Sequence, residues 1–146
     1  MRQAQTLNEA QFRRVLHYCR SRRHPVRDTT IFMVSFYAGL RAKEIAALKL
    51  GDVFDDTGAV RDQFILGVDQ SKGRQCRTVY LNQRLRKALA NYAKSKCLQE
   101  LDHPLFESQK GGHFSANTMC QLFLDIYKAC GLKAAVCGSL WHILHV

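Results

Sequence analysis

The sequence predicts an α+β domain that is mainly helical and carries one small antiparallel β-sheet. Apolar residues recur at helical spacing both before residue 50 and after residue 82. Between these regions, two short runs rich in β-branched and aromatic residues flank a Ser-Lys-Gly turn, a pattern typical of a hairpin. No internal repeat or Pro/Gly/Ser-rich linker divides the 146 residues, so we expect a single domain with one core.

The first fifty residues are predicted to form three helices. A capping box at Thr6-Leu7-Asn8-Glu9 should start the first helix, which runs from about residue 7 to residue 20. Asp28 is expected to cap a second, almost wholly apolar helix, and Gly39 is expected to end it. A third helix follows over about residues 41–48.

The rest of the chain should continue as a sheet, then helices, then a tail. The hairpin is centred near Lys72-Gly73, and Asn82 begins a helix that runs to about residue 97. Ser115 should cap the last helix, and Gly131 should end it. The expected segments are helices over 1–50, the small sheet over 51–81, helices over 82–133 and an atypical tail over 134–146.

The composition fits a folded protein that does not span a membrane. Hydrophobic residues make up 47% of the chain and charged residues 23%, a mixture typical of globular domains rather than disordered ones. No apolar run approaches the roughly 20 residues that cross a bilayer. The N-terminus shows no apolar segment of a secretory signal, so we expect a cytoplasmic location.

Six cysteines and six histidines raise the question of disulfides or a metal site. No Cys-x-x-Cys pair occurs, and no spacing of cysteines and histidines matches a standard zinc site. We therefore expect neither a metal nor another cofactor. Without a secretory signal, the cysteines are expected to be reduced thiols in the core: Cys19, Cys76, Cys97, Cys120, Cys130 and Cys137.

The net charge of +10 and its distribution indicate a polyanionic partner. Residues 1–50 hold ten Lys and Arg against three acidic residues, and residues 71–96 hold eight against none. The segment 51–70 between them holds five acidic residues against one arginine. Two separate basic blocks favour a surface that faces nucleic acid, although a solvated basic helix face is the commoner reason for such runs.

Three short motifs follow one another along the chain. They are Ala38-Gly39-Leu40-Arg41 with Glu44 three residues later, Ser71-Lys72-Gly73 with the strand Arg77-Thr78-Val79-Tyr80-Leu81 behind it, and Pro104-Leu105-Phe106 leading through Gly111-Gly112 to an amphipathic helix. In order and spacing this resembles the catalytic domain of the tyrosine recombinases, or phage integrases, over about residues 6–132. The first motif is fairly specific, and the other two add weight by their order.

The resemblance implies DNA strand breakage and rejoining, with Arg41, Glu44 and Lys72 in the active site. Phosphodiester transfer builds negative charge on phosphate oxygens, and an enzyme without a metal must supply fixed cations there. Arg41 offers a planar fork for two oxygens, and Glu44 can hold that fork or complete the polar network around it. Lys72, at the hairpin tip, can donate a proton to the leaving 5′ oxygen. By spacing alone, the Arg41 and Glu44 pair is more often a surface ion pair worth about 0.5 kcal/mol or less.

Further basic residues are expected to contact the phosphates of double-stranded DNA. They are Arg20, Arg22, Arg23, Arg27, Lys43, Arg74, Arg77, Arg84 and Arg86. The competing interpretation is that these side chains only keep the surface solvated.

Two parts of the family's active site find no match. His142 stands about where the family histidine is expected, but His145 occupies the place of the arginine that should follow it. No tyrosine follows His142, so no nucleophile is present to form a phosphotyrosyl intermediate. We expect the chain alone not to cleave DNA and to represent a truncated catalytic domain or the product of a disrupted gene. We also expect self-association through exposed core or through the tail.

Two other functions stay open. A non-catalytic DNA-binding or protein-interaction module with the same fold would bind DNA without needing Arg41. A cytosolic helical protein whose charge serves only solubility would not bind DNA at modest salt. The type IB topoisomerases share related chemistry, but residues 38–50 are more similar to an integrase.

Overall fold

The computed structural model of the chain describes residues 7–67, 76–95 and 100–132. Helices precede and follow a two-stranded sheet, which confirms the predicted α+β class. The elements are α1 (Glu9–Arg20), α2 (Pro25–Met33), the π-helical turn η1 (Val34–Ala38), α3 (Ala42–Ala47), α4 (Leu50–Val53), β1 (Gln63–Leu66), β2 (Arg77–Tyr80), α5 (Gln83–Lys94) and α6 (Ala116–Ala129).

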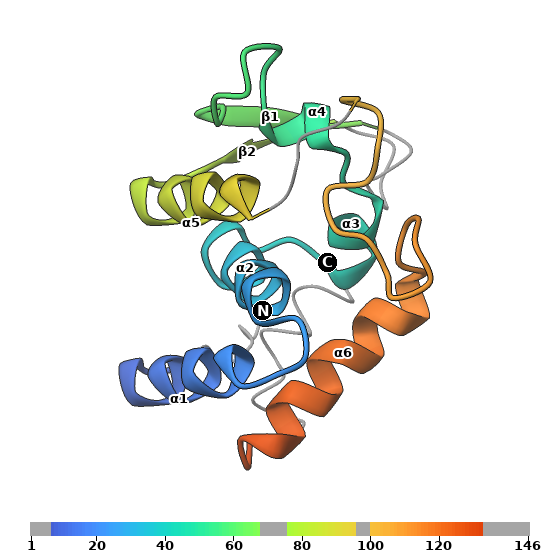
Figure 1. The fold of residues 1–146 in the computed structure, drawn as a ribbon. Coiled ribbons are helices and arrows are strands. Elements are labelled where there is room, and N and C mark those ends of the chain that lie inside the picture. The colour runs from blue at the N-terminus through green and yellow to red at the C-terminus, as the bar shows by residue number, and fades with distance from the viewer. Residues whose placement is uncertain (1–6, 68–75, 96–99, 133–146) are drawn as a thin grey trace.

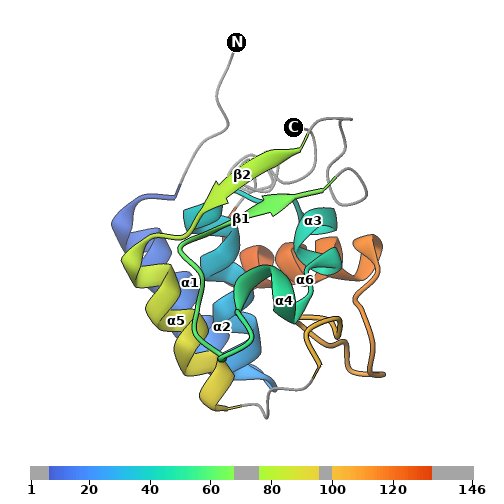
Figure 2. The same ribbon diagram turned by 90° about the horizontal axis from the view of Figure 1, so that it is seen from above.

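Helix α2 lies at the centre of the helical layer. It packs against α1 on one side and α5 on the other, while α3 packs against α6 (Figure 1). The sheet covers one end of these helices, and β1 contacts α4 (Figure 2). This arrangement places the segment between α2 and α3, which carries Arg41, close behind the sheet.

One apolar cluster fills the space between the helices and the sheet. The predicted stripe of α6 is buried in it, through Met119, Leu122, Phe123 and Ile126. Phe12 of α1 packs at the edge of this cluster, with its ring centroid 4.5 Å from that of Phe36 in η1. Burial of this apolar surface is the main favourable contribution to folding.

The two strands pair antiparallel, with Phe64 opposite Val79 and Ile65 opposite Thr78. Phe64 and Val79 face the core, whereas Ile65 is 61% exposed and Tyr80 69% exposed on the outer face. Alternate residues of a strand point to opposite faces, so this register buries one face of the sheet and leaves the other in solvent. The predicted hairpin tip at Lys72-Gly73 lies outside the described residues.

The start of the first helix was predicted two residues too early. Asn8, not Thr6, is the N-cap, because its side chain accepts a hydrogen bond from the Gln11 amide at 2.8 Å. The Gln11 side chain in turn accepts one from the Asn8 amide at 2.9 Å, which completes a capping box. Any Ser, Thr, Asn or Asp can cap a helix, so two neighbouring candidates left the start ambiguous in the sequence.

The prediction that Asp28 caps the second helix is wrong. Asp28 lies buried in the first turn of that helix. The helix begins at Pro25, a residue suited to a first helical position because it has no amide hydrogen to leave unpaired. Asp28 instead binds the Nε atoms of Arg22 at 2.8 Å and Arg27 at 2.9 Å. The carboxylate is therefore the centre of a buried ion-pair network rather than a cap.

The single-turn helix α4 was not predicted, because residues 51–60 contain turn-forming residues. It is held by the connector that follows α5: the amide of Leu50 donates to the His103 carbonyl at 2.9 Å, and the amide of Gly51 donates to the Leu101 carbonyl at 2.7 Å. A Cβ atom at Gly51 would lie 3.1 Å from the Leu101 carbonyl oxygen, so glycine permits this close approach.

Four predicted helix boundaries are confirmed. Gly39 and Gly131 follow helical segments with positive φ of 67° and 73°. The side chains of Asn82 and Ser115 each accept a hydrogen bond from the backbone amide of the third residue of the helix that follows, α5 and α6, as N-caps do. Helix α5 ends at Lys94, three residues before the predicted end.

The cysteines differ in their surroundings, so the prediction of core thiols holds only in part. Cys19 and Cys130 are buried, Cys120 is half-buried, and Cys76 is exposed, which contradicts the prediction for that residue. All four are free thiols. The remaining two, Cys97 and Cys137, lie outside the described residues.

The buried thiol of Cys19 should make stability fall at alkaline pH. Burial, with the nearby charge of Asp28, raises the pKa of Cys19 to about 12, whereas the unfolded thiol ionises near its ordinary pKa. Because the pKa is higher in the folded than in the unfolded protein, the neutral Cys19 thiol contributes to the free energy of unfolding. This contribution is complete below about pH 8.5 and is lost as the pH rises toward 12. Between pH 8 and pH 10 we expect the free energy of unfolding, measured by urea, to fall by about 2 kcal/mol less in Cys19→Ala than in the wild type. Equal losses in the two proteins would contradict this assignment.

No helix in the described part of the chain is long and apolar enough to cross a membrane.

Candidate phosphate-binding site

The segment that carries Arg41 is fixed by the change of backbone direction between η1 and α3. The widened last turn η1 ends at Gly39, whose φ of 67° turns the chain out of the helix. Leu40 is then fully buried and anchors the segment in the core. Arg41 follows in an extended conformation, with φ −73° and ψ 154°, as the residue before α3.

Glu44 holds this segment from one turn further along. Its side chain is 1% exposed, and its Oε1 accepts a hydrogen bond from the backbone amide of Arg41 at 2.9 Å. This contact satisfies one of the amides that a helix start leaves unpaired. Glu44 therefore fixes the backbone of Arg41. Of the two roles that the sequence suggested for Glu44, completing the local polar network agrees with this contact, whereas holding the Arg41 guanidinium does not.

A second arginine reaches the same carboxylate from the sheet. The Nη2 atom of Arg77, on β2, lies 2.9 Å from Oε1 of Glu44. Arg77 was predicted as a DNA contact, and its ion pair with Glu44 was not foreseen because the two residues are 33 positions apart. Through Glu44, this ion pair connects strand β2 to the backbone of Arg41.

The guanidinium of Arg41 is the least satisfied group of this network. Its Nε and Nη1 atoms are buried and have no hydrogen-bond partner among the described residues, and the same is true of Oε2 of Glu44. Burying a charged donor without a partner costs free energy, and native proteins keep few such groups. An anion bound at Arg41 would supply the missing acceptors.

Within the described residues, the other predicted basic side chains are either paired with a carboxylate or exposed to solvent. Arg22 and Arg27 bind Asp28, and Nη1 of Arg86 lies 2.7 Å from Oδ1 of Asp62. Burial alone would lower the pKa of Arg22, but the hydrogen bond and charge of Asp28 outweigh it and raise that pKa. The side chains exposed to solvent are Arg20, Arg23, Lys43 and Arg84. Lys72, Arg74 and His142 lie outside the described residues.

Tyr127 belongs to the core, as its place in the apolar stripe of α6 predicted, and is almost fully buried. Its ring lies edge-on to Phe32, with centroids 6.3 Å apart. A nucleophile must reach the phosphorus atom of DNA, so Tyr127 has a packing role in this structure.

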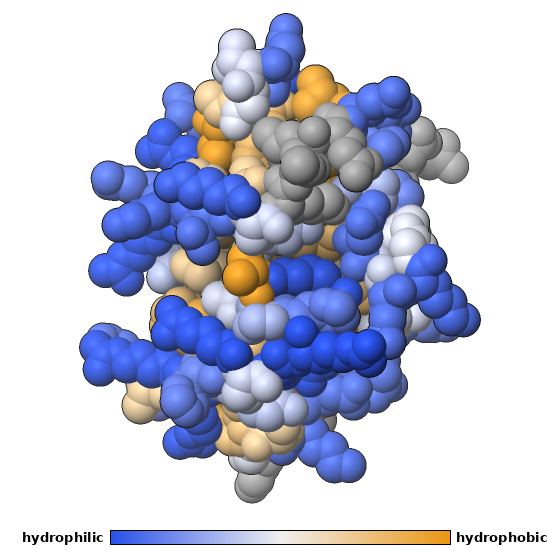
Figure 3. Space-filling view, in the orientation of Figure 1, coloured by the Kyte–Doolittle hydropathy of each residue, from blue (hydrophilic) through white to orange (hydrophobic). Residues whose placement is uncertain are grey.

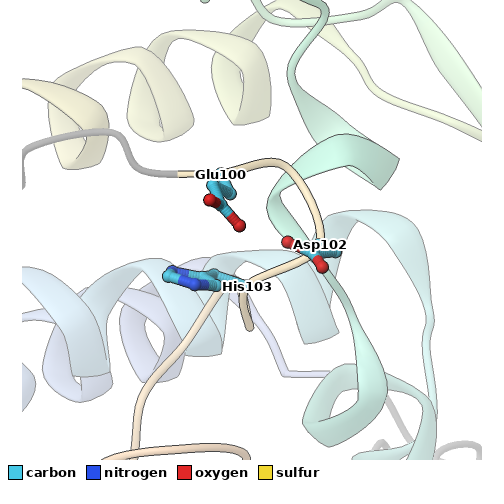
Figure 4. Close-up of side chains that lie close together, drawn as sticks. All are labelled: Glu100, Asp102 and His103. Atoms are coloured by element: carbon cyan, nitrogen blue, oxygen red, sulfur yellow. The ribbon is translucent and has the colours of Figure 1, made fainter.

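Three side chains on the connector after α5 come within 4.8 Å of one another: Glu100, Asp102 and His103 (Figure 4). All three come from one short loop, and both carboxylates are exposed. Exposed acidic groups often lie close together without an ion. The backbone of this loop forms hydrogen bonds with α4, and we assign no metal site to its side chains.

The mainly helical fold with its small antiparallel sheet agrees with the fold that the resemblance to the tyrosine recombinases implies. The chain belongs to the phage integrase family, whose model matches residues 5–142. Among solved structures, the XerA recombinase superposes with a TM-score of 0.70 at 21% identity, covering 96% of this chain and 47% of that chain. The XerH site-specific recombinase, bound to its difH substrate, superposes with a TM-score of 0.61 at 18% identity, covering 96% of this chain and 42% of that one.

A curated relative is the transposase A from transposon Tn554 of Staphylococcus aureus. It is 27% identical over 134 residues, which is 87% of this chain and 35% of the relative. The chain thus spans about a third of the length of the curated relatives it matches. The family and the fold are shared across this span, and the described core, from α1 to α6, lies within the matched region.

Proposed function

We propose that this domain binds duplex DNA through its phosphates, with Arg41 as the central phosphate ligand, and that it serves site-specific recombination. The observation that carries the proposal is that Nε and Nη1 of the half-buried Arg41 are buried and have no hydrogen-bond partner among the described residues, on a backbone fixed by Glu44. A rigid cation with free donors is what a phosphate group requires, and a guanidinium can pair with two of its oxygens at once. Membership of the phage integrase family supports the same function.

The roles proposed around Arg41 follow the chemistry of phosphodiester transfer. Arg41 would stabilise the negative charge that grows on the phosphate oxygens. Lys72 would donate a proton to the leaving 5′ oxygen, and His142 would take the place of the family histidine. Arg77 would act by holding Glu44. A cytoplasmic location would suit these roles.

The exposed basic side chains would extend the contact along the DNA backbone. Arg20, Arg23, Lys43 and Arg84 are exposed, and their charges lie on three different helices or the turn between them. Arg22, Arg27 and Arg86 already bind carboxylates, so we expect a smaller contribution from them. Phosphate contacts of this kind carry little sequence information.

DNA binding is expected to weaken steeply with salt. Each phosphate neutralised by Lys or Arg releases counterions, so contacts from Arg41 and the four exposed cations, about five phosphates, give a slope of about −4 to −5 in a plot of log K against log salt. Fluorescence anisotropy with a labelled duplex of random sequence, from 25 to 200 mM salt, measures that slope. An affinity that stays flat in salt would rule out phosphate binding.

The chain alone is expected to bind DNA without cutting it. No tyrosine follows His142, where the family's nucleophile is expected, and Tyr127, the last tyrosine of the sequence, is buried. We therefore expect no phosphotyrosyl bond to form. Incubation with a nicked duplex, which traps covalent intermediates, should yield no protein–DNA adduct on a denaturing gel. A trapped adduct would overturn this prediction and would identify the attacking residue by mass spectrometry.

Self-association is a separate proposal. Ile65 and Tyr80 present exposed apolar surface on the outer face of the sheet, where a second copy could pack. Sedimentation velocity at tens of micromolar protein would show a dimer or larger species. A single monomeric boundary at that concentration would count against the proposal.

A further inference from the structure

A groove of about 500 Å³ opens between α1, α2 and α5. Its floor is apolar, formed mainly by Phe12, Leu16, Val26, Met33 and Ala88. Figure 3 shows a small apolar patch among hydrophilic side chains on this face of the molecule, over α2 where it passes between α1 and α5. None of Arg41, Glu44 and Arg77 lines the groove, so it is separate from the Arg41 site, but it shares Arg20 and Arg84 with the proposed DNA contacts.

The rim of the groove is positively charged. Arg20 comes from α1, and Arg84 and Lys87 come from α5 on the opposite side. All three side chains are exposed, and no acidic side chain is among the described residues that line the groove. The groove therefore combines apolar surface with uncompensated positive charge.

We propose that this groove binds an amphipathic helical segment of a partner protein, with apolar side chains on one face and carboxylates beside them. The apolar floor matches the recurring mode in which a helix places its hydrophobic face in a groove. The cations on both sides match carboxylates that flank such a face, because complementary charge fixes the orientation of a bound segment. The size of the groove lies within the range of sites that hold a few side chains.

Two other occupants fit the same observations less well. A DNA backbone would engage the three rim cations but would leave the apolar floor without a matching surface. A second copy of this chain would bring another strongly basic protein, with a net charge of +10, against a basic rim. An acidic, apolar segment satisfies both parts of the groove. This inference goes beyond the proposed DNA-binding function and does not depend on it.

The test uses the whole 146-residue chain and a fluorescent helical peptide of about sixteen residues, with leucines on one face and glutamates flanking them. A peptide with every glutamate replaced by glutamine keeps the apolar face and removes the charge. In anisotropy titrations we expect the acidic peptide to bind with a Kd of about 10–100 μM and the glutamine peptide to bind at least fivefold more weakly.

Two variants address the two parts of the groove. Ala88→Trp fills the floor and should abolish peptide binding, while Lys87→Glu reverses one rim charge and should weaken it about tenfold. Lys94→Glu changes an exposed lysine on the same helix that does not line the groove, and it should leave binding unchanged. Circular dichroism of each variant checks that α5 remains folded, and Lys87→Glu tests the rim even where the bulky tryptophan disturbs the core.

Several results would overturn the proposal. These are no peptide binding at 1 mM, equal binding of the two peptides, or equal loss with Lys94→Glu and Lys87→Glu. Displacement of the peptide by duplex DNA, together with loss of DNA binding in Ala88→Trp, would assign the groove to DNA instead. A dimer in sedimentation that Ala88→Trp dissociates would assign it to a second copy of the chain.

Discussion

Replacing Glu44 by alanine is expected to destabilise the fold by about 2–3 kcal/mol. The carboxylate is almost fully buried and accepts from both the Arg41 amide and the Arg77 guanidinium at 2.9 Å. Its removal leaves a buried backbone donor and a cation without their partner. Arg77 is 37% exposed and can recover some hydration, so the cost should lie below the upper range seen for fully buried ion pairs.

Urea unfolding followed by far-UV circular dichroism measures this loss. Glu9→Ala is the matched control, because Glu9 forms an ion pair with Arg13 in which both side chains are 75% exposed. Exposed pairs contribute little, and we expect a change of about 0.5 kcal/mol or less for that variant. Glu44→Gln should fall between the two, since both hydrogen bonds go to Oε1 and an amide oxygen can still accept them, but it carries no charge to pair with Arg77. A Glu44→Ala variant as stable as Glu9→Ala would contradict the structural role assigned to the carboxylate.

Replacing Arg41 by alanine is expected to weaken DNA binding about tenfold while leaving stability unchanged or slightly increased. The loss of a guanidinium that pairs with phosphate accounts for the affinity, since tenfold corresponds to about 1.4 kcal/mol. The unchanged stability follows from the unpaired Nε and Nη1 atoms, whose removal breaks no hydrogen bond to a described residue. A residue that contributes to ligand binding but does not stabilise the folded state is typical of a functional site.

Lys43→Ala is the matched control for this experiment. Lys43 is an exposed cation two residues away on α3, so its replacement removes the same charge from the same region. We expect it to weaken binding about two- to threefold, as one peripheral phosphate contact does. Equal losses for Arg41 and Lys43 would mean that only net charge matters. DNA binding that does not change with Arg41→Ala would favour a module that binds DNA elsewhere on the same fold.

The course of the chain could largely be predicted from the sequence because its signals are local. Helix periodicity, the caps at Asn82 and Ser115, and the stop at Gly39 each depend on residues within a few positions of one another. The same holds for the Arg41 motif, which lies within one turn and its flanking residues. Such local features carry most of the resemblance to the phage integrases.

Contacts between distant residues could not be predicted in the same way. The pairing of Arg77 with Glu44 depends on how the sheet docks on α3, and the helix α4 depends on a connector about fifty residues later. Asp28 looked like a cap because the sequence gives its side-chain chemistry but not its burial. Tertiary context decided all three. It also pairs Arg22 and Arg27, which were predicted to contact DNA, with one shared carboxylate, that of Asp28.

The most direct test of the central claim follows the Arg41 guanidinium itself. In a ¹⁵N-labelled sample, the side-chain Nε–H resonance of Arg41, assigned by its loss in Arg41→Lys, is recorded while duplex DNA is added at low salt. A phosphate bound at Arg41 should shift this resonance and slow its exchange with water, with a concentration dependence that matches the anisotropy titration. A resonance that stays in place while those of Arg20 and Arg84 move would show that DNA binds away from Arg41, and would contradict the account.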